Sequence, residues 1–260
     1  MNSLYSSVHI LACFLLGQLS QGQAAPVVLA DVAHAASAAT HTVLDRAPTG
    51  YSQLWAVFSR RPCMAKVNRG PLSSATLADV STVVVTVLAP DKPLSPDEVQ
   101  SLKKFVESGG TLLLVNGDLA PPAMGTWNKL AGEFGIQSHG GVTRLTAPQG
   151  PSTHISRYSG AGLARWLRGL EDAQLYCQTS SAGPKGGEVL VSYDGTAFAA
   201  VQPAGRGRVY VFGGDMLSNA YTSAKAAAAP SETPAANVRL LDALIDELLA
   251  PAHKPETAKP

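Results

Sequence analysis

The sequence is poor in charge and lacks the compact motifs that mark common catalytic and cofactor sites. Only 15% of its 260 residues are charged and the net charge is +1, so it does not carry the basic patch that nucleic-acid binding requires. It has no Walker loop, no Gly-x-Gly-x-x-Gly after a strand and no Gly-x-Ser-x-Gly. His-x-x-x-His and Cys-x-x-Cys spacings are also absent. We therefore expect no nucleic-acid partner, no metal and no cofactor.

Long apolar runs are missing too, and the longest one lies at the N-terminus. Val8–Gly17 is too short to span a bilayer comfortably, but it fits the core of an export signal. Gly22 and Ala24 place small residues where a signal peptidase would cut before Ala25. We expect residues 1–24 to be a signal peptide and the mature chain to be periplasmic or extracellular, without a membrane span. An uncleaved anchor, a non-exported tail and lipidation at Cys13 are the alternatives.

Cysteine is scarce, with three in the chain. Removal of the signal would leave Cys63 and Cys177, which can form one disulfide in an exported protein. The alternative is two separate buried thiols. Neither cysteine is followed by a Gly-rich turn, so we do not expect either to be a catalytic nucleophile.

The most informative stretch runs from Val83 to Gly117 and predicts a strand, a helix and a second strand. Both strand segments, Val83–Leu88 and Thr111–Val115, are continuously apolar or β-branched, as in central parallel strands covered on both faces. Between them, Ser95 is a suitable helix N-cap and Glu98 completes a capping box. This βαβ unit predicts an α/β fold with a mostly parallel, doubly wound sheet.

The remaining segments extend this sheet and close the domain. Val27–Ala33 is an expected first strand with Asp31 or His34 near its end, and residues 51–58 and 127–134 have helical apolar spacing. Strands expected in the C-terminal half are Leu175–Thr179, Val189–Tyr193, Ala197–Val201 and Arg208–Phe212. Turns at Asp194-Gly195 and Ala204–Gly207 make this half partly antiparallel. We expect one domain over residues 25–250, closed by a helix over 238–248, and a disordered tail over 251–260.

Three stretches resemble a known group of domains. They are Leu94–Leu113, with its acidic helix, Gly-Gly pair and apolar strand; Asn128–Ile136; and Gly205–Asn219. Together they are similar to the class I glutamine-amidotransferase-like domains (a flavodoxin-like fold) of bacterial envelope proteins, gliding-motility ABC-transporter auxiliary proteins and an intraflagellar-transport subunit. The resemblance implies the same fold and a role in membrane-linked complexes. The nucleophilic cysteine of the true amidotransferases has no counterpart here, because the turn after the central strand is Asn116-Gly117-Asp118.

Polar residues follow two of the expected strands, where ligands bind in open α/β sheets. They are Asn116, Asp118, Asp215, Ser218 and Asn219. Their carboxylates and amides can bind sugar hydroxyls, a cation or a protein partner. The alternative for Asp118 and Asp215 is that both aspartates cap the following turns and satisfy backbone N–H groups.

These observations favour a non-catalytic, exported binding or interaction domain in an envelope-associated complex, with a protein or a carbohydrate as its ligand. A hydrolase acting on a sugar-like substrate through Asp118 and Asp215 is the first alternative, because two carboxylates can share acid and base roles across one cleft. A structural scaffold without a ligand site is the second.

Overall fold

A computed structural model of the chain describes residues 24–35, 41–116, 121–139, 154–155, 165–166, 175–176, 181–184, 186–193, 196–213, 216–222 and 235–250. Some side chains within these ranges, including that of Asn116, are outside the description. Statements below about what the protein contains refer to these residues.

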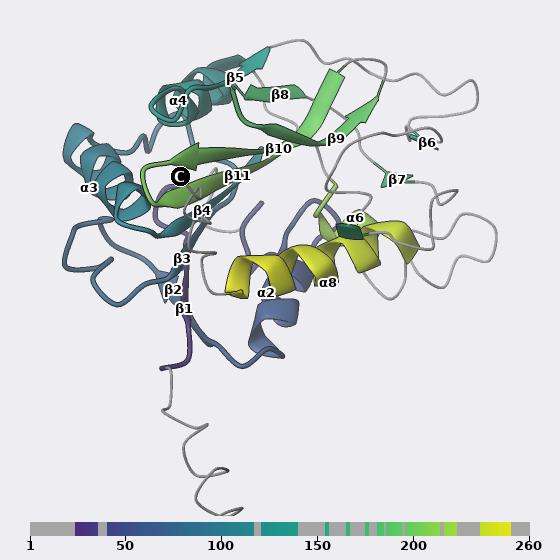
Figure 1. The fold of residues 1–260 in the computed structure, drawn as a ribbon, viewed down its shortest axis with the longest axis horizontal. Helices are drawn as coiled ribbons and strands as arrows, with labels where there is room; N and C mark the ends of the chain where they lie inside the picture. The colour runs from purple at the N-terminus through teal and green to yellow at the C-terminus, as the bar shows by residue number, and fades with distance from the viewer. Residues whose placement is uncertain are drawn as a thin grey trace, which may run out of the picture.

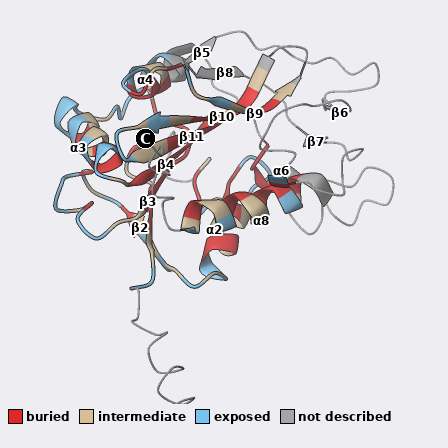
Figure 2. Cartoon of the chain, in the orientation of Figure 1, coloured by how far each residue is buried: buried red, intermediate tan, exposed pale blue. Residues whose placement is uncertain are grey.

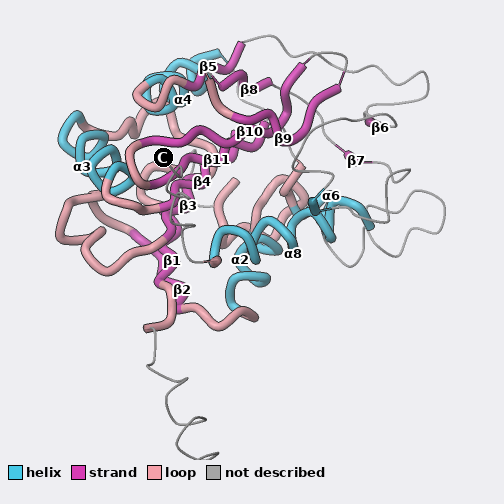
Figure 3. Tube along the Cα trace, in the orientation of Figure 1, coloured by secondary structure: helices cyan, strands magenta, loops and turns pink. Residues whose placement is uncertain are grey.

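A seven-stranded sheet forms the centre of the molecule, with the strand order β2-β1-β3-β4-β11-β10-β9. Its strands are β1 (Val27–Asp31), β2 (Met64–Asn68), β3 (Thr82–Val85), β4 (Thr111–Asn116), β9 (Glu188–Tyr193), β10 (Thr196–Ala204) and β11 (Gly207–Gly213). The first five strands in spatial order are parallel, and β10 and β9 are antiparallel to their neighbours. The predicted α/β fold, mostly parallel with an antiparallel C-terminal extension, is confirmed (Figure 3).

Helices cover both faces of this sheet. They are α2 (Ser52–Ser59), α3 (Pro96–Glu107), α4 (Pro121–Gly132), α6 (Asn219–Thr222) and α8 (Ala235–Leu249). In Figure 1, α3 and α4 lie on one side of the sheet, and α2, α6 and α8 lie together on the other. This arrangement follows from the strand order. The crossover from β1 to β2 and the crossover from β3 to β4 run in opposite directions along the sheet, and right-handed crossovers of opposite direction place their helices on opposite faces.

The predicted capping box at the start of α3 is present. Ser95 Oγ accepts a hydrogen bond from the backbone N–H of Glu98, and the Glu98 side chain accepts one from the backbone N–H of Ser95. Gly109, with φ of 115°, follows the helix, and β4 begins two residues later. Here the local signals alone placed both helix ends correctly, because they act through backbone groups within one turn.

Several predicted boundaries were wrong, among them the end of the first strand, which was expected at Ala33 and lies at Asp31. The strand expected over Val83–Leu88 is β3, which ends at Val85, because Leu88 leaves the parallel ladder and forms an antiparallel bridge with Ala35. The helix expected over 127–134 is α4, which begins at Pro121. Proline is well tolerated in the first turn of a helix, where its missing N–H has no partner to lose.

The C-terminal half contains the predicted antiparallel strands and two small additional sheets. Gly205 and Arg206 form the predicted turn between β10 and β11, since Ala204 lies opposite Gly207. The turn expected at Asp194-Gly195 lies outside the described residues, although Tyr193 and Thr196 are paired on either side of it. The additional sheets pair β5 (Ile136–His139) with β8 (Ser181–Pro184), and β6 (His154–Ile155) with β7 (Leu175–Tyr176).

The hydrophobic core lies on both faces of the central strands. All residues of β3, and residues 111–115 of β4, are buried, as their continuous apolar runs predicted (Figure 2). Tyr51, Leu54 and Phe58 are fully buried on the side of α2. Among the helices described, none has the length and apolar character needed to cross a bilayer.

Candidate functional site

The carboxyl edge of the parallel sheet contains a closed cluster of polar side chains beside β1. The connection that leaves β1 goes to β2 on one side, and the connection that leaves the adjacent β3 goes to β4 on the other side, so a topological switch lies between β1 and β3. Asp31 is the last residue of β1, and Asn68 is the last residue of β2. Glu98 lies in the first turn of α3. The fold therefore brings three elements together where open α/β sheets usually bind ligands.

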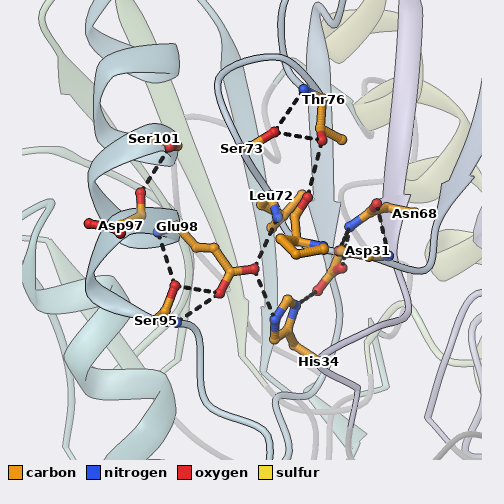
Figure 4. A network of polar contacts seen from close by, with 12 residues as sticks. Asp31, His34, Asn68, Leu72, Ser73, Thr76, Ser95, Asp97, Glu98 and Ser101 are labelled. Atoms are coloured by element: carbon orange, nitrogen blue, oxygen red, sulfur yellow. Dashed lines mark hydrogen bonds and ion pairs between the residues drawn. The ribbon is translucent and has the colours of Figure 1, made fainter.

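His34 lies at the centre of this cluster (Figure 4). Its Nδ1 is 2.9 Å from Asp31 Oδ2, and its Nε2 is 3.1 Å from Glu98 Oε1. The chain turns sharply after β1, so that His34 folds back toward the end of the strand that carries Asp31. Both ring nitrogens of one histidine are thus engaged by carboxylates from two different elements.

The outer atoms of the cluster are occupied by other groups. Asn68 Nδ2 donates to Asp31 Oδ1 over 3.0 Å, and Glu98 Oε1 also accepts from the backbone N–H of Leu72 over 3.0 Å. Glu98 Oε2 accepts from both the backbone N–H and the hydroxyl of Ser95. Every carboxylate oxygen in the cluster therefore has an internal donor.

These contacts favour the charged forms of His34 and Glu98. The hydrogen bond to Asp31 raises the pKa of His34 above 6.5, against the opposing effect of burial, and the negative charges of Asp31 and Glu98 add to this rise. Burial by itself would raise the pKa of Glu98, but the hydrogen bonds from Ser95 and Leu72 and the charge of His34 lower it below 4.5. The contacts of both ring nitrogens with carboxylate oxygens likewise favour the imidazolium form of His34.

This arrangement is unsuited to acid–base catalysis by His34. A general base needs a free lone pair near the substrate, and His34 has both nitrogens in contact with carboxylates. Cys63 lies just before β2, whereas Asn68 and the cluster lie at its other end. A five-residue strand separates them by roughly 16 Å, so Cys63 and His34 cannot act as a nucleophile and base pair.

The strand ends singled out from the sequence do lie side by side. Gly213 at the end of β11 pairs with Asn116 at the end of β4. The side chain of Asn116 and the whole of Asp118 and Asp215 lie outside the described residues. The structure thus supports the proximity of the two strand ends, while the ligand-binding role of these three residues stays a prediction.

The side chains of Asn219 and Ser218 are buried inside the protein, whereas a ligand-binding residue is expected to be accessible. Asn219 Nδ2 donates to the carbonyls of Asp45 and Ala47, at 2.8 and 2.7 Å, and its Oδ1 accepts from the backbone N–H of Gln53 at 2.9 Å. The amide of Asn219 therefore holds the loop before α2. Ser218 is completely buried, so its hydroxyl is closed to any ligand.

Cys63 has a free thiol whose Sγ lies 3.1 Å from the carbonyl oxygen of Phe58, and burial raises its pKa. Cys177 lies outside the described residues. The disulfide between Cys63 and Cys177 therefore stays a prediction. Within the described ranges, no group of three or more His, Cys, Asp or Glu side chains is arranged to hold a metal ion.

Sequence reasoning missed the cluster around His34, although parts of it were visible. Glu98 stood out only as a capping residue, and His34 only as a residue near a strand end. An aspartate ending a buried strand with a histidine three residues later, in the first strand of a doubly wound sheet, was the available signal. Nothing in the sequence indicated that Asn68 and Leu72 contribute hydrogen bonds to the cluster. Their contacts depend on how β2 and the loop after it lie beside β1.

Comparison with known proteins defines the class to which this fold belongs. Residues 43–229 match the family model "Domain of unknown function (DUF4350)". Because the match covers most of the chain, the protein belongs to this DUF4350 family. No protein with a curated description matches the sequence.

Solved structures share the fold at low sequence identity. The mmIFT52 N-terminal domain is 16% identical with a TM-score of 0.63, and the match covers 85% of this chain and 97% of that one. Two cytoplasmic proteins from Salmonella typhimurium are each 12% identical with a TM-score of 0.55. Those matches cover 88% and 86% of this chain and 100% and 99% of theirs. At such identities the likeness concerns the fold alone.

Proposed function

We propose that this chain is a non-catalytic, exported binding domain that recognises a protein partner or a carbohydrate at the carboxyl edge of its sheet. The observation that carries the proposal is the closed Asp31–His34–Glu98 cluster at the switch point. The titratable side chains of this cluster bind one another and leave no free base or nucleophile among the residues described at the switch point. The edge is thereby rigidified without gaining a reactive atom, which suits recognition.

The resemblance to glutamine-amidotransferase-like domains supports the same proposal. The three stretches that carry it fall on α3 with β4, on α4 with the start of β5, and on β11 with the start of α6. The turn after β4 has Asn116-Gly117-Asp118 and no cysteine. A link to a membrane-associated complex of the envelope is part of the proposal on the basis of this resemblance.

Export is proposed from the N-terminal sequence, and the position of β1 is compatible with it. Cleavage before Ala25 would leave Val27, the first residue of β1, intact. It would also keep the carbonyl of Pro26, which accepts a hydrogen bond from the N–H of Met64 over 2.8 Å. The mature chain would thus retain the complete sheet.

The test uses a double variant, Asp118→Ala with Asp215→Ala, and a matched control, Asp79→Ala. Asp79 is exposed and precedes β3, at the opposite edge of the sheet. Each protein is applied to a glycan array and used for co-purification from the native envelope fraction. We expect a ligand that the wild type and the control retain and the double variant loses, with an unchanged melting temperature.

Other outcomes would point elsewhere. Turnover of nitrophenyl glycosides that disappears in the double variant would support the sugar hydrolase, which the pairing of the β4 and β11 ends makes geometrically reasonable. A double variant that melts at a lower temperature but still binds every ligand of the wild type while folded would show that the aspartates only cap turns. A complete lack of ligands would favour the scaffold.

A further inference from the structure

The loop formed by residues 41–50 is attached to the carboxyl edge of the sheet by a residue distant in sequence. Besides its two side-chain bonds to the carbonyls of Asp45 and Ala47, Asn219 donates its backbone N–H to the carbonyl of Gly50 over 2.8 Å. Three carbonyls of the loop are thus held by one residue of α6. This places the loop beside the chain that leaves β11.

The same loop is also fixed from within. The Asp45 carboxylate accepts hydrogen bonds from the backbone N–H groups of His41 and Ala47, at 2.9 and 2.8 Å. The backbone carbonyl of Asp45 accepts a hydrogen bond from the backbone N–H of Ser52 at 3.2 Å. Gly50 packs so closely on Asp45 that an added Cβ would overlap the Asp45 carbonyl oxygen. The loop backbone is therefore held in one conformation by contacts on both of its sides.

This fixed loop presents an apolar and a basic side chain to solvent. Leu44 is 44% exposed, and of the residues described only Leu44 and Met64 are large exposed hydrophobics. Residues 46–49 are exposed as well. Because the backbone on either side of Leu44 is bonded into the loop, this side chain cannot be buried by a small local rearrangement. An apolar side chain held in this way can contact a partner without a change in the loop backbone.

Arg46 adds a charge that the loop does not neutralise. The neighbouring carboxylate of Asp45 is occupied by backbone N–H groups, and among the described residues no carboxylate forms an ion pair with Arg46. A guanidinium can bind a partner carboxylate through two parallel hydrogen bonds. The exposed face of the loop is therefore complementary to an apolar surface bordered by acidic residues.

We propose that the loop over residues 41–50 is a preformed recognition element for a protein partner, and that the docking segment of this partner is apolar and acidic. Leu44 would supply the buried apolar contact and Arg46 the ion pair. The inference rests on the proposed binding function and names the type of ligand. A backbone that is already ordered loses little conformational entropy on binding, which raises the affinity that a small contact can reach.

The test is a selection of random peptides displayed on phage against the immobilised full-length mature chain. We expect enrichment of peptides that combine acidic and large apolar residues. Leu44→Ser and Arg46→Glu should each weaken binding of an enriched peptide by roughly tenfold or more. The matched controls are Met64→Ser and Lys66→Glu, which change an equally exposed apolar and basic pair on β2. All four variants should keep the wild-type melting temperature.

The outcomes separate this inference from the function on which it rests. If the enriched peptides bind both loop variants as tightly as the wild type but bind the Asp118 and Asp215 double variant more weakly, the loop proposal is wrong and the proposed binding function stands. Peptides that respond equally to the β2 controls would show non-specific adhesion and overturn the proposal. If no acidic peptide is enriched, the proposed partner chemistry is wrong. Binding of glycans alone would also exclude it.

Discussion

Individual side chains at the carboxyl edge act mainly on one another. Glu98 shows this most clearly, because a single carboxylate caps α3, holds the backbone of Leu72 and pairs with His34. Such a residue combines a helix-capping role with an ion pair. Its contribution should therefore exceed that of an ordinary surface acid of the same helix.

Glu98→Gln should lower the free energy of unfolding by about 2 kcal/mol, because it removes the charge opposite His34 and weakens the capping box. Asp97→Asn is the matched control, since Asp97 is the adjacent exposed acid in the same turn. Urea unfolding of both variants measures the difference. Equal losses in the two variants would show that the cluster contributes nothing beyond the charge of the helix terminus.

Asn219→Ala should cost about 2–4 kcal/mol, because it leaves the carbonyls of Asp45 and Ala47 and the N–H of Gln53 without their partner. Thermal melting measures the effect. A variant that melts like the wild type would contradict the structural role and return Asn219 to the set of ligand-binding candidates.

At the scale of elements, the cluster around His34 joins the end of β1 to the start of α3 and to the chain after β2. The turn between β10 and β11 makes a second junction, against the end of α3. The first junction depends on charge and the second on the absence of side chains. The two should therefore respond to different perturbations.

The charge-dependent junction predicts a defined pH dependence. A raised His34 pKa means that its contribution is complete below pH 6.5 and is lost as the pH rises through the higher folded-state pKa. A lowered Glu98 pKa means that its contribution is present above pH 4.5 and is lost as the pH falls through the lower folded-state pKa. Both contributions are present between these two values.

We therefore expect the free energy of unfolding to fall as the pH is raised from 6.5 into the alkaline range. The variant His34→Gln should reduce this fall, because glutamine does not titrate. Urea unfolding at a series of pH values provides the measurement. If the free energies of unfolding of the wild type and the variant fall in parallel above neutral pH, His34 does not titrate as inferred.

The tight junction is at Gly207, where an added Cβ would overlap the carbonyl oxygens of Val106 and Gly110. Gly207→Ala should cost more than about 2 kcal/mol, because backbone has to move away from α3. Gly125→Ala is the control: it lies within α4 with open space around it and should stabilise by about 0.5–1 kcal/mol. If both substitutions shift the melting temperature alike, the close approach of β11 to α3 is not a constraint.

For the whole molecule, the proposed export fixes where the mature chain begins. Intact-mass measurement of the protein purified from its native source should give a chain that starts at Ala25, because small residues precede that position and the sheet starts only at Val27. A chain that retains residues 1–24 would contradict the cleavage. A mature chain that begins at a lipid-modified Cys13 would instead support the lipoprotein alternative.

The sequence by itself determined the α/β fold, the covered central strands, the capping box of α3 and the antiparallel C-terminal half. These features depend on residues close together in the chain, such as Ser95 with Glu98, or on the unbroken apolar run over 111–115. The same local signals misjudged the end of β3, because the bridge between Ala35 and Leu88 joins segments that no short pattern relates.

Only the tertiary structure decided how the polar residues at the sheet edge are used. His34 lies between Asp31 and Glu98 because β1 and α3 meet at the switch point, across 64 residues of chain from His34 to Glu98. Asn219 holds the loop over 41–50 because the end of β11 lies beside it, 174 residues from Asp45. Partners so distant in sequence are set by strand order and packing, so residue types alone could not distinguish a ligand-binding amide from one that supports the fold.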